Sequence, residues 1–357
     1  MKNKNMTNNK IIIKNGDVKS MENKKLSKVA SQRVEKNLKV LKLLKENNNN
    51  MSLEEKRIIL DEYTGWGGLR SAIYTPSIFK KLKCYLNDDE ISQIKKTTRS
   101  AYYTPELLVK FIWSVVDITG FQGGRILEPA AGHGVFIDKM PKHIFDNSLI
   151  DAVEMDLLTS KILLRQTPQI ELTATCFENI YFGKRKYDLV ISNPPYSSQI
   201  VEDIYYKDLS HLAIHHFFVA KCARLLKDNG IIAMVLPLFF LDNTRDHARD
   251  IISKDGVNML MAYRLPDNIF ANAKISVDIV FLTKAKTGIS WTKSKSCKIG
   301  NHRKPMNEYF INNPDNILGT LEVVPMYDRT GITCTSNGDL RDQLKEVYLN
   351  LKEKSRK

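Results

Sequence analysis

The stretch RILEPAAGHGVF, residues 125–136, is the most informative part of this 357-residue chain for its fold. Residues 125–128 have the composition of a short strand, which ends at Pro129 because proline has no N–H to donate to a sheet. A loop that contains Gly132 and Gly134 follows directly. A strand that runs into a glycine loop is typical of open sheets in which strands alternate with helices.

The alternation continues toward the carboxyl end. We predict further strands over residues 149–153, 170–175, 187–192, 231–236 and 275–282, with helices over residues 157–166 and 211–226. Strands separated by helices favour parallel pairing, because a parallel connection needs a crossover. The sequence therefore predicts an α/β fold with a doubly wound, mostly parallel sheet.

The residues before 101 have a different pattern. Apolar residues recur at three- and four-residue steps between residues 21 and 46, which predicts an amphipathic helix. Ser52 and Glu55 have the spacing of a capping box at the start of another helix. We expect four regions: a disordered basic arm (1–20), an N-terminal helical region (21–100), the α/β domain (101–290) and a small basic and helical C-terminal region (291–357).

Positive charge is concentrated in two parts of the chain. The net charge is +14, and residues 1–50 hold thirteen Lys and Arg against four Asp and Glu. Residues 279–307 hold seven Lys and Arg, no acid, and Trp291. Such clusters suit a polyanionic partner, although a solubilising tail and a solvated loop would have the same composition.

The cysteines and the apolar runs limit the class of protein. The five cysteines form no CxxC pair, so neither a zinc ribbon nor a disulfide framework is indicated, and we expect a reduced, cytoplasmic protein. The longest apolar run, residues 230–241, is too short to cross a bilayer. We expect no membrane partner.

The glycine loop and the end of the next strand together indicate a nucleoside site. Gly132 and Gly134 let the backbone approach a ligand, and the carboxylate of Glu154, beside Met155, could accept hydrogen bonds from both hydroxyls of a ribose. Ile137 replaces the third glycine of the pyrophosphate fingerprint. A ribose without a phosphate favours S-adenosylmethionine over NAD. The residues expected around this cofactor are Tyr103, Thr104, Pro105, Glu128, Pro129, Ala130, Gly132, Gly134, Glu154 and Met155.

The Tyr103-Thr104-Pro105 turn precedes the glycine loop. Thr104 is expected to cap a helix with Pro105 at its first position. The turn could contact the methionine end of the cofactor, and plain helix capping is the alternative.

The buried strand 187–192 leads directly into Asn193-Pro194-Pro195-Tyr196. The prolines remove two N–H groups, so the backbone here can only accept hydrogen bonds. The Asn193 side-chain oxygen and the Pro194 carbonyl could accept both hydrogens of an exocyclic amine, which leaves its lone pair free to attack a sulfonium methyl. Tyr196 could stack on a flat base that has been flipped out of a duplex. These four residues are the predicted catalytic loop, and Asn193 would also border the cofactor.

These residues resemble the amino-methyltransferase superfamily, in its N6-adenine DNA branch and with a motif order similar to the gamma class. Residues 63–69, 215–221, 264–270 and 276–282 are similar to segments of large phage- and plasmid-borne methylase–helicase proteins. The resemblance covers roughly residues 50–320 and implies a class I S-adenosylmethionine-dependent fold with a seven-stranded sheet and an N-terminal helical extension. It further implies a DNA N6-adenine methyltransferase that acts alone or with a separate helicase or specificity partner.

The resemblance assigns two more positions. Cys176-Phe177-Glu178 stands where family members usually place an Asp-Phe pair against the cofactor adenine, so either Cys176 or Glu178 would make that contact. Phe270 resembles the second aromatic residue that would sandwich a flipped base opposite Tyr196. Core packing is the alternative for Phe270.

DNA contacts are expected mainly through phosphates, with weak or very short sequence specificity. Metal binding by His211, His215 and His216 is not expected, because the reaction needs no metal. RNA or protein-glutamine methylation and a non-catalytic antirestriction protein remain alternatives. The candidate DNA contacts are Lys284, Lys286, Trp291, Lys293, Lys295 and Lys298.

Overall fold

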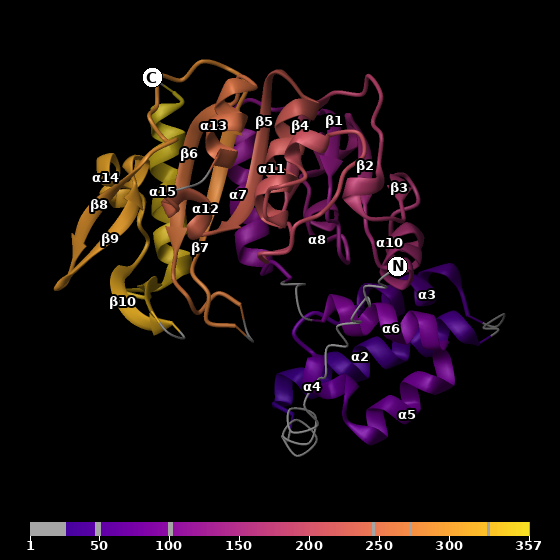
Figure 1. The fold of residues 1–357 in the computed structure, drawn as a ribbon. Coiled ribbons are helices and arrows are strands. Elements are labelled where there is room, and N and C mark those ends of the chain that lie inside the picture. The colour runs from indigo at the N-terminus through magenta and orange to yellow at the C-terminus, as the bar shows by residue number, and fades with distance from the viewer. Residues whose placement is uncertain are drawn as a thin grey trace, which may run out of the picture. The chain divides into compact units, whose positions relative to one another are not determined.

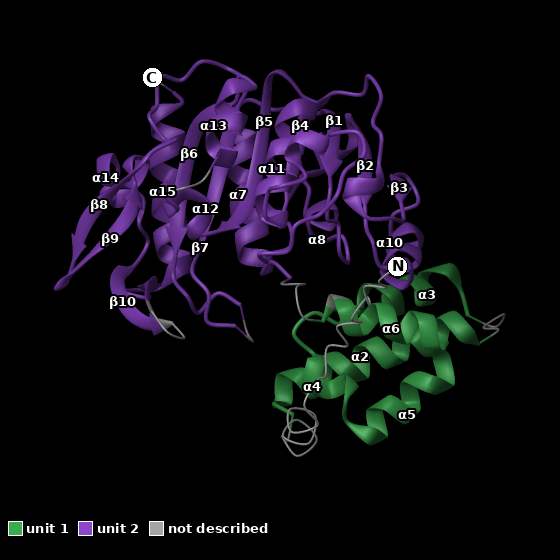
Figure 2. Ribbon diagram, viewed as in Figure 1, with its two compact units in different colours: residues 1–98 green, residues 99–357 purple. Residues whose placement is uncertain are grey.

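A computed structural model of the chain describes residues 26–46, 51–98, 103–244, 247–270, 273–326 and 329–356. The chain divides into two compact units, residues 1–98 and residues 99–357 (Figure 2). The expected arm over residues 1–20 lies outside the described residues. The expected small C-terminal region, residues 291–357, belongs to the same unit as the sheet.

Unit 1 is helical in its described part. Ser52 and Glu55 form the expected capping box, and the first helix begins at Lys28, where Ser27 caps it by accepting from the Ala30 N–H. The Arg33 guanidinium donates to the carbonyls of residues 64, 65 and 67 at 3.0–3.2 Å, which holds the glycine-rich loop over residues 65–68 against this helix. The helices are α2 (Lys28–Lys45), α3 (Leu53–Asp61), α4 (Arg70–Ile73), α5 (Pro76–Tyr85) and α6 (Asp88–Thr97).

Unit 2 is built on a seven-stranded sheet whose order, among the described residues, is β3-β2-β1-β4-β5-β7-β6 (Figure 1). The first five strands along the chain pair in parallel, and β7 pairs antiparallel to both β5 and β6. This confirms the predicted α/β fold with a mostly parallel sheet. The strands are β1 (Gly124–Glu128), β2 (Ser148–Val153), β3 (Glu171–Thr173), β4 (Tyr187–Ser192), β5 (Leu226–Pro237), β6 (Asn258–Leu265) and β7 (Val277–Thr283).

Helices cover both faces of the sheet. Val190 of β4 faces the layer that contains α11 (Ile214–Leu225) and α13 (His247–Lys254). Its neighbours Leu189 and Ile191 face the opposite layer, which contains α7 (Glu106–Ile118) and α15 (Leu340–Lys354). Successive strand residues point to opposite faces, so a strand buried on both sides is apolar throughout. The remaining helices of unit 2 are α8 (Val135–Asp138), α9 (Lys142–Asp146), α10 (Leu157–Gln166), α12 (Phe239–Asp242) and α14 (Glu308–Asn312), with short 3-10 turns at η1 (Phe177–Asn179), η2 (Lys207–Leu209) and η3 (Pro314–Asn316).

The sequence did not predict β6 or the two hairpins that follow the sheet. The hairpins are β8–β9 (Ser294–Ile299 and His302–Asn307) and β10–β11 (Thr320–Met326 and Arg329–Thr335). Their side chains lack the clean polar and apolar alternation of a half-buried strand, because much of each hairpin is exposed. Among the described helices, none has the length and apolar composition needed to cross a membrane.

Candidate active site

The loops singled out from the sequence meet at one edge of the sheet. β1, β2, β3 and β4 are neighbours and run in parallel, so their carboxyl ends lie together. The strand order reverses between β1 and β4, and ligands of open α/β sheets bind at such a switch point. The glycine loop, which contains Gly132 and Gly134, follows β1. The Asn193 loop, Asn193-Pro194-Pro195-Tyr196, follows β4, so the two loops lie one on each side of this point.

The glycine loop has the backbone conformation that its glycines predict. Gly132 and Gly134 have φ values of 54° and 81°, which L side chains rarely adopt. A Cβ at Gly134 would lie 2.3 Å from Leu163 Cδ1 of α10, so a side chain there would have to displace the buried side chain of Leu163. The Tyr103 ring lies beside the loop, with its centroid 4.7 Å from that of His133.

The carboxylate of Glu154, the residue that follows β2, binds the backbone of the glycine loop. Its Oε2 accepts from the Gly132 N–H at 2.8 Å, and its Oε1 accepts from the Asp156 N–H at 2.8 Å. Burial raises the pKa of Glu154 to about 7, even though these backbone N–H groups lower it. The Met155 side chain beside it is exposed.

Glu128 lies at the end of β1 with only 1% of its surface exposed. Neither of its side-chain oxygens has a hydrogen-bond partner among the described residues. Burial, and then the nearby Glu154 carboxylate, hold its pKa well above the usual range. A buried carboxyl group without a donor is costly, so this position is suited to a ligand that brings one.

The helix α7, which follows the Tyr103-Thr104-Pro105 turn, begins one residue later than expected. The helix starts at Glu106, and the Pro105 carbonyl accepts from the Leu108 and Val109 N–H groups. Pro105 is thus the N-cap, and the prediction of Thr104 as the cap was wrong, because the Pro105 backbone is still extended. Thr104 is buried.

The Asn193 loop emerges from a fully buried strand end. The Tyr196 hydroxyl lies 2.9 Å from the Val235 carbonyl oxygen and also within hydrogen-bonding distance of Asn193 Oδ1, and its one proton can be donated to either of these acceptors. When the proton is donated to Asn193 Oδ1, this hydrogen bond orients the side-chain amide of Asn193. The Tyr196 ring is 8% exposed and Phe270 is 6% exposed, and both belong to the same apolar cluster.

A buried ion pair between Lys221 and Asp203 connects two segments of unit 2, and the sequence did not predict it. Lys221 of α11 donates to Asp203 Oδ2 at 2.7 Å, and both side chains are fully buried. The same Nζ donates to the carbonyls of Phe177 and Ile180 at 2.8 and 3.0 Å. Asp203 Oδ1 accepts from two further backbone N–H groups. The pair thus ties the segment after β3 to the segment after the Asn193 loop.

Cys176 directly precedes Phe177, whose carbonyl accepts a hydrogen bond from Lys221. Phe177 is buried in a cluster of aromatic rings, and Cys176 and Glu178 are each half-buried. The sequence holds one signal for Lys221, because it is the one charged residue in the apolar helix stretch 212–223 apart from two histidines. Its partner lies eighteen residues earlier in a loop, which no helical spacing indicates.

The histidines of α11 pack against aromatic rings. The His215 ring lies 4.8 Å from Phe239 and that of His216 lies 5.3 Å from Phe240, centroid to centroid. His215 Nδ1 is 3.2 Å from the carbonyl oxygen of Ser197, directly after the Asn193 loop. In the described part of the chain, no three His, Cys, Asp or Glu side chains gather as metal ligands would.

The structure shows where three of the candidate DNA contacts lie. Trp291 is 2% exposed and belongs to the apolar core, so it does not offer a surface to DNA. Lys284 and Lys286 follow the carboxyl end of β7, and the Lys284 ammonium donates to the carbonyl of Leu226, the first residue of β5. Because β7 is antiparallel, this end lies at the opposite edge of the sheet from the Asn193 loop, about 20 Å away along a seven-residue strand.

The sheet order, the antiparallel β7 and the glycine loop after β1 define the class I S-adenosylmethionine-dependent methyltransferase fold. A model of the N-6 DNA methylase family matches residues 89–328. The chain belongs to this family.

The chain is similar to curated proteins whose names refer to methyl transfer or to restriction. The chain is 28% identical over 203 residues to the type II methyltransferase M.CvrRI of Paramecium bursaria Chlorella virus XZ-6E, which covers 55% of this chain and 51% of that protein. It is 23% identical over 288 residues to the defense against restriction protein B of Escherichia phage P1, which covers 78% of this chain and 11% of that protein. The chain thus spans about half the length of the first relative and about a tenth of the second.

A solved structure from Listeria monocytogenes is described as a putative class I S-adenosylmethionine-dependent methyltransferase. It aligns with 74% of this chain and 90% of its own, at 17% identity and a TM-score of 0.48.

Proposed function

We propose that this chain transfers a methyl group from S-adenosylmethionine to the exocyclic N6 of an adenine in DNA. The observation that carries the proposal is the position of the Asn193 loop at the switch point of the sheet, directly across from the glycine loop. Membership of the N-6 DNA methylase family supports the choice of the acceptor.

The residues after β1 and β2 fit such a cofactor. Glu128 offers a buried carboxyl group that lacks a donor, and a cationic amino group would both donate to it and stabilise its ionised form. Glu154 already accepts two backbone hydrogen bonds, and its oxygens have lone pairs left for two ribose hydroxyls. When bound, S-adenosylmethionine supplies an electrophilic methyl group on a sulfonium.

The Asn193 loop positions the attacking amine. Asn193 Oδ1 and the Pro194 carbonyl accept the two hydrogens on the adenine nitrogen, and Pro195 adds no competing N–H. Asn193 Oδ1 has two lone pairs, so the Tyr196 hydroxyl can hold it in orientation while it also accepts from the amine. This geometry aims the nitrogen lone pair, and orientation supplies most of the rate enhancement.

We further propose that Tyr196 and Phe270 flank the flipped base. Both rings belong to one buried apolar cluster, and stacking on a base would keep them out of water. Recognition is proposed to be weak or very short in sequence, with affinity that comes mainly from phosphate contacts.

The test is transfer of a labelled methyl group to duplex DNA, single-stranded DNA, RNA and a glutamine-containing protein, followed by modified-base mapping. We expect N6-methyladenine in DNA, spread over many sequence contexts. Label that appears only in RNA or in protein would overturn the acceptor, and complete methylation of one long motif would overturn the proposed weak specificity.

Variants of the loop separate catalysis from folding. Asn193→Ala is expected to lower kcat by about a hundredfold or more, by analogy with the loss of one positioned polar group in an active site, while cofactor affinity measured by calorimetry is largely kept. Tyr196→Ala should behave similarly. Asn179→Ala, an exposed asparagine after β3, is a matched control and should leave kcat unchanged. Unchanged turnover in Asn193→Ala would contradict the proposed mechanism.

A further inference from the structure

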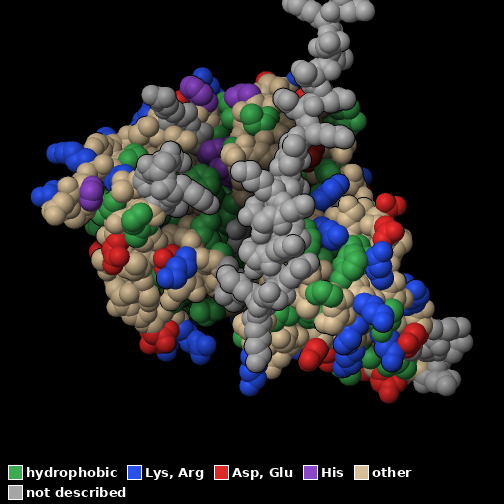
Figure 3. All heavy atoms as spheres, turned by 60° about the horizontal axis from the view of Figure 1, so that its bottom comes forward, with side chains coloured by type: hydrophobic (Ala, Val, Ile, Leu, Met, Phe, Trp, Pro, Cys, Tyr) green, Lys and Arg blue, Asp and Glu red, His purple; other side chains and the backbone are tan. Residues whose placement is uncertain are grey.

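The β8–β9 hairpin is a small separate sheet with a strongly basic composition. Six residue pairs run from Ser294↔Asn307 at its base to Ile299↔His302 at its tip. Residues 294–307 contain no acid, and their basic side chains are Lys295, Lys298, His302, Arg303 and Lys304. Figure 3 shows blue and purple side chains together on the left margin of the molecule, the side where Figure 1 places β8 and β9.

The pairing register places like charges opposite each other. Lys298 pairs directly with Arg303, and both side chains are exposed. Directly opposed like charges on a ribbon are destabilising, and the ion pairs of the described residues include no partner for either cation. An anion bound at this pair would remove the repulsion, so the arrangement fits a polyanion.

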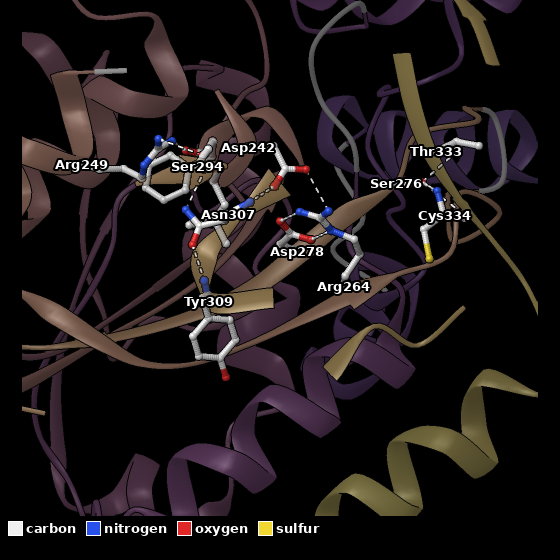
Figure 4. A network of polar contacts seen from close by, with 12 residues as sticks. Asp242, Arg249, Arg264, Ser276, Asp278, Ser294, Asn307, Tyr309, Thr333 and Cys334 are labelled. Atoms are coloured by element: carbon white, nitrogen blue, oxygen red, sulfur yellow. Dashed lines mark hydrogen bonds and ion pairs between the residues drawn. The ribbon is translucent and has the colours of Figure 1, made fainter. Parts of the chain in front are cut away.

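The hairpin is rigidly held at its base (Figure 4). The Asn307 side chain donates to the carbonyls of Leu241 and Trp291 at 2.9 and 2.7 Å, and its backbone N–H donates to Asp242. The Ser294 hydroxyl donates to the same Leu241 carbonyl at 2.9 Å. An isolated two-stranded ribbon is marginally stable, so these buried contacts supply the support that it needs.

The same support leads to the Asn193 loop. Leu241 and Asp242 belong to α12, which follows the carboxyl end of β5, and the first two residues of α12 pack against His215 and His216. His215 in turn contacts the Ser197 carbonyl next to the catalytic loop. The short helix α12, at the carboxyl edge of the sheet, therefore contacts the hairpin directly and is connected to the Asn193 loop through His215.

A buried ion network fixes α12 itself. Arg264 of β6 makes a bidentate pair with Asp278 of β7 at 2.9 Å and donates to Asp242 at 2.8 Å. Its guanidinium also lies 4.3 Å from the centroid of the Phe310 ring of α14. The base of the hairpin is thus joined to β6 and β7 by buried charged groups, which resist displacement because each needs its partner.

We propose that the β8–β9 hairpin is a DNA-binding ribbon that enters the major groove of a duplex and places Lys298 and Arg303 on phosphates. The major groove is wide enough to admit a two-stranded ribbon. This inference rests on the proposed function for its substrate and identifies the element that positions the duplex for the Asn193 loop.

The test compares duplex binding by the full chain and by Lys298→Ala/Arg303→Ala, using fluorescence anisotropy over a range of salt concentrations. Loss of two phosphate contacts should make the slope of log K against log salt shallower by about two and lower the affinity about ten- to a hundredfold at 0.1 M salt. The loss should be smaller on a single strand of the same sequence, which has no groove.

Lys352→Ala/Lys354→Ala is the matched control, because it removes two exposed charges from the last turn of α15. Lys298→Gln/Arg303→Gln is a second variant that keeps longer side chains, and a melting curve of each protein checks folding. Equal losses in the hairpin and control variants, or equal losses on duplex and single strand, would overturn the proposal. If the hairpin variants lose duplex binding but the wild-type chain methylates no DNA, the hairpin assignment stands and the proposed function fails.

Discussion

The buried pair between Lys221 and Asp203 offers the sharpest test of how the site is held together. Lys221→Met keeps most of the apolar stem but removes the charge and three hydrogen bonds, to Asp203, Phe177 and Ile180. It leaves a fully buried carboxylate without its cation. Breaking a buried pair in this way costs about 3–5 kcal/mol.

The size of the cost sets the expected melting temperature. Unit 2 comprises residues 99–357, and an unfolding entropy of about 2.1 cal/mol/K per residue gives about 0.5 kcal/mol/K for the unit. We therefore expect Lys221→Met to lower the melting temperature by about 6–9 °C, measured by scanning calorimetry on the full chain.

A double-mutant cycle isolates the pair from general packing. Asp203→Asn removes the buried charge, so Lys221→Met/Asp203→Asn should be less destabilised than the sum of the two single variants, by about 1–3 kcal/mol. The reasoning is refuted if Lys221→Met melts within about 2 °C of the wild type, or if the double variant loses the full sum.

Three further predictions concern the glycine loop, the cofactor carboxylate and the ion network. Gly134→Ala should lower stability by about 1–3 kcal/mol more than Gly183→Ala, because both glycines have positive φ but only Gly134 lacks room for a Cβ; urea titrations of the two variants would measure the difference. The raised pKa of Glu154 means that the folded chain holds its proton more tightly than the unfolded chain between pH 4.5 and about 7, so this group's contribution to stability falls as pH rises through that window. Cofactor affinity by calorimetry should rise over the same window as the carboxylate ionises, and a flat profile equal to that of Glu154→Gln would contradict the assignment. Arg264→Met should cost about 3–5 kcal/mol and be partly rescued when its two carboxylate partners are changed to Asn, and no rescue in thermal melts would argue against a charge-based role.

Much of the fold is encoded in local patterns. The strand 187–192 was predicted with its observed ends, because a short, mostly apolar run between a charged segment and Asn193-Pro194 favours a buried strand. The strand β6 was not predicted, and the buried Arg264 near its end is compensated by Asp278, which lies on another strand.

By itself, the sequence determined the α/β alternation, the glycine loop with its acid after the next strand, and the Asn193-Pro194-Pro195-Tyr196 loop. Each depends on residues that are neighbours along the chain, and turn and strand chemistry is local. Only the tertiary structure decided which charges pair and which lysines lie near the catalytic edge. Lys284 and Lys298 are close in sequence, yet the reversed direction of β7 places Lys284 at the opposite edge of the sheet. Strand order and direction are set by packing of the whole core, so no segment carries that information alone.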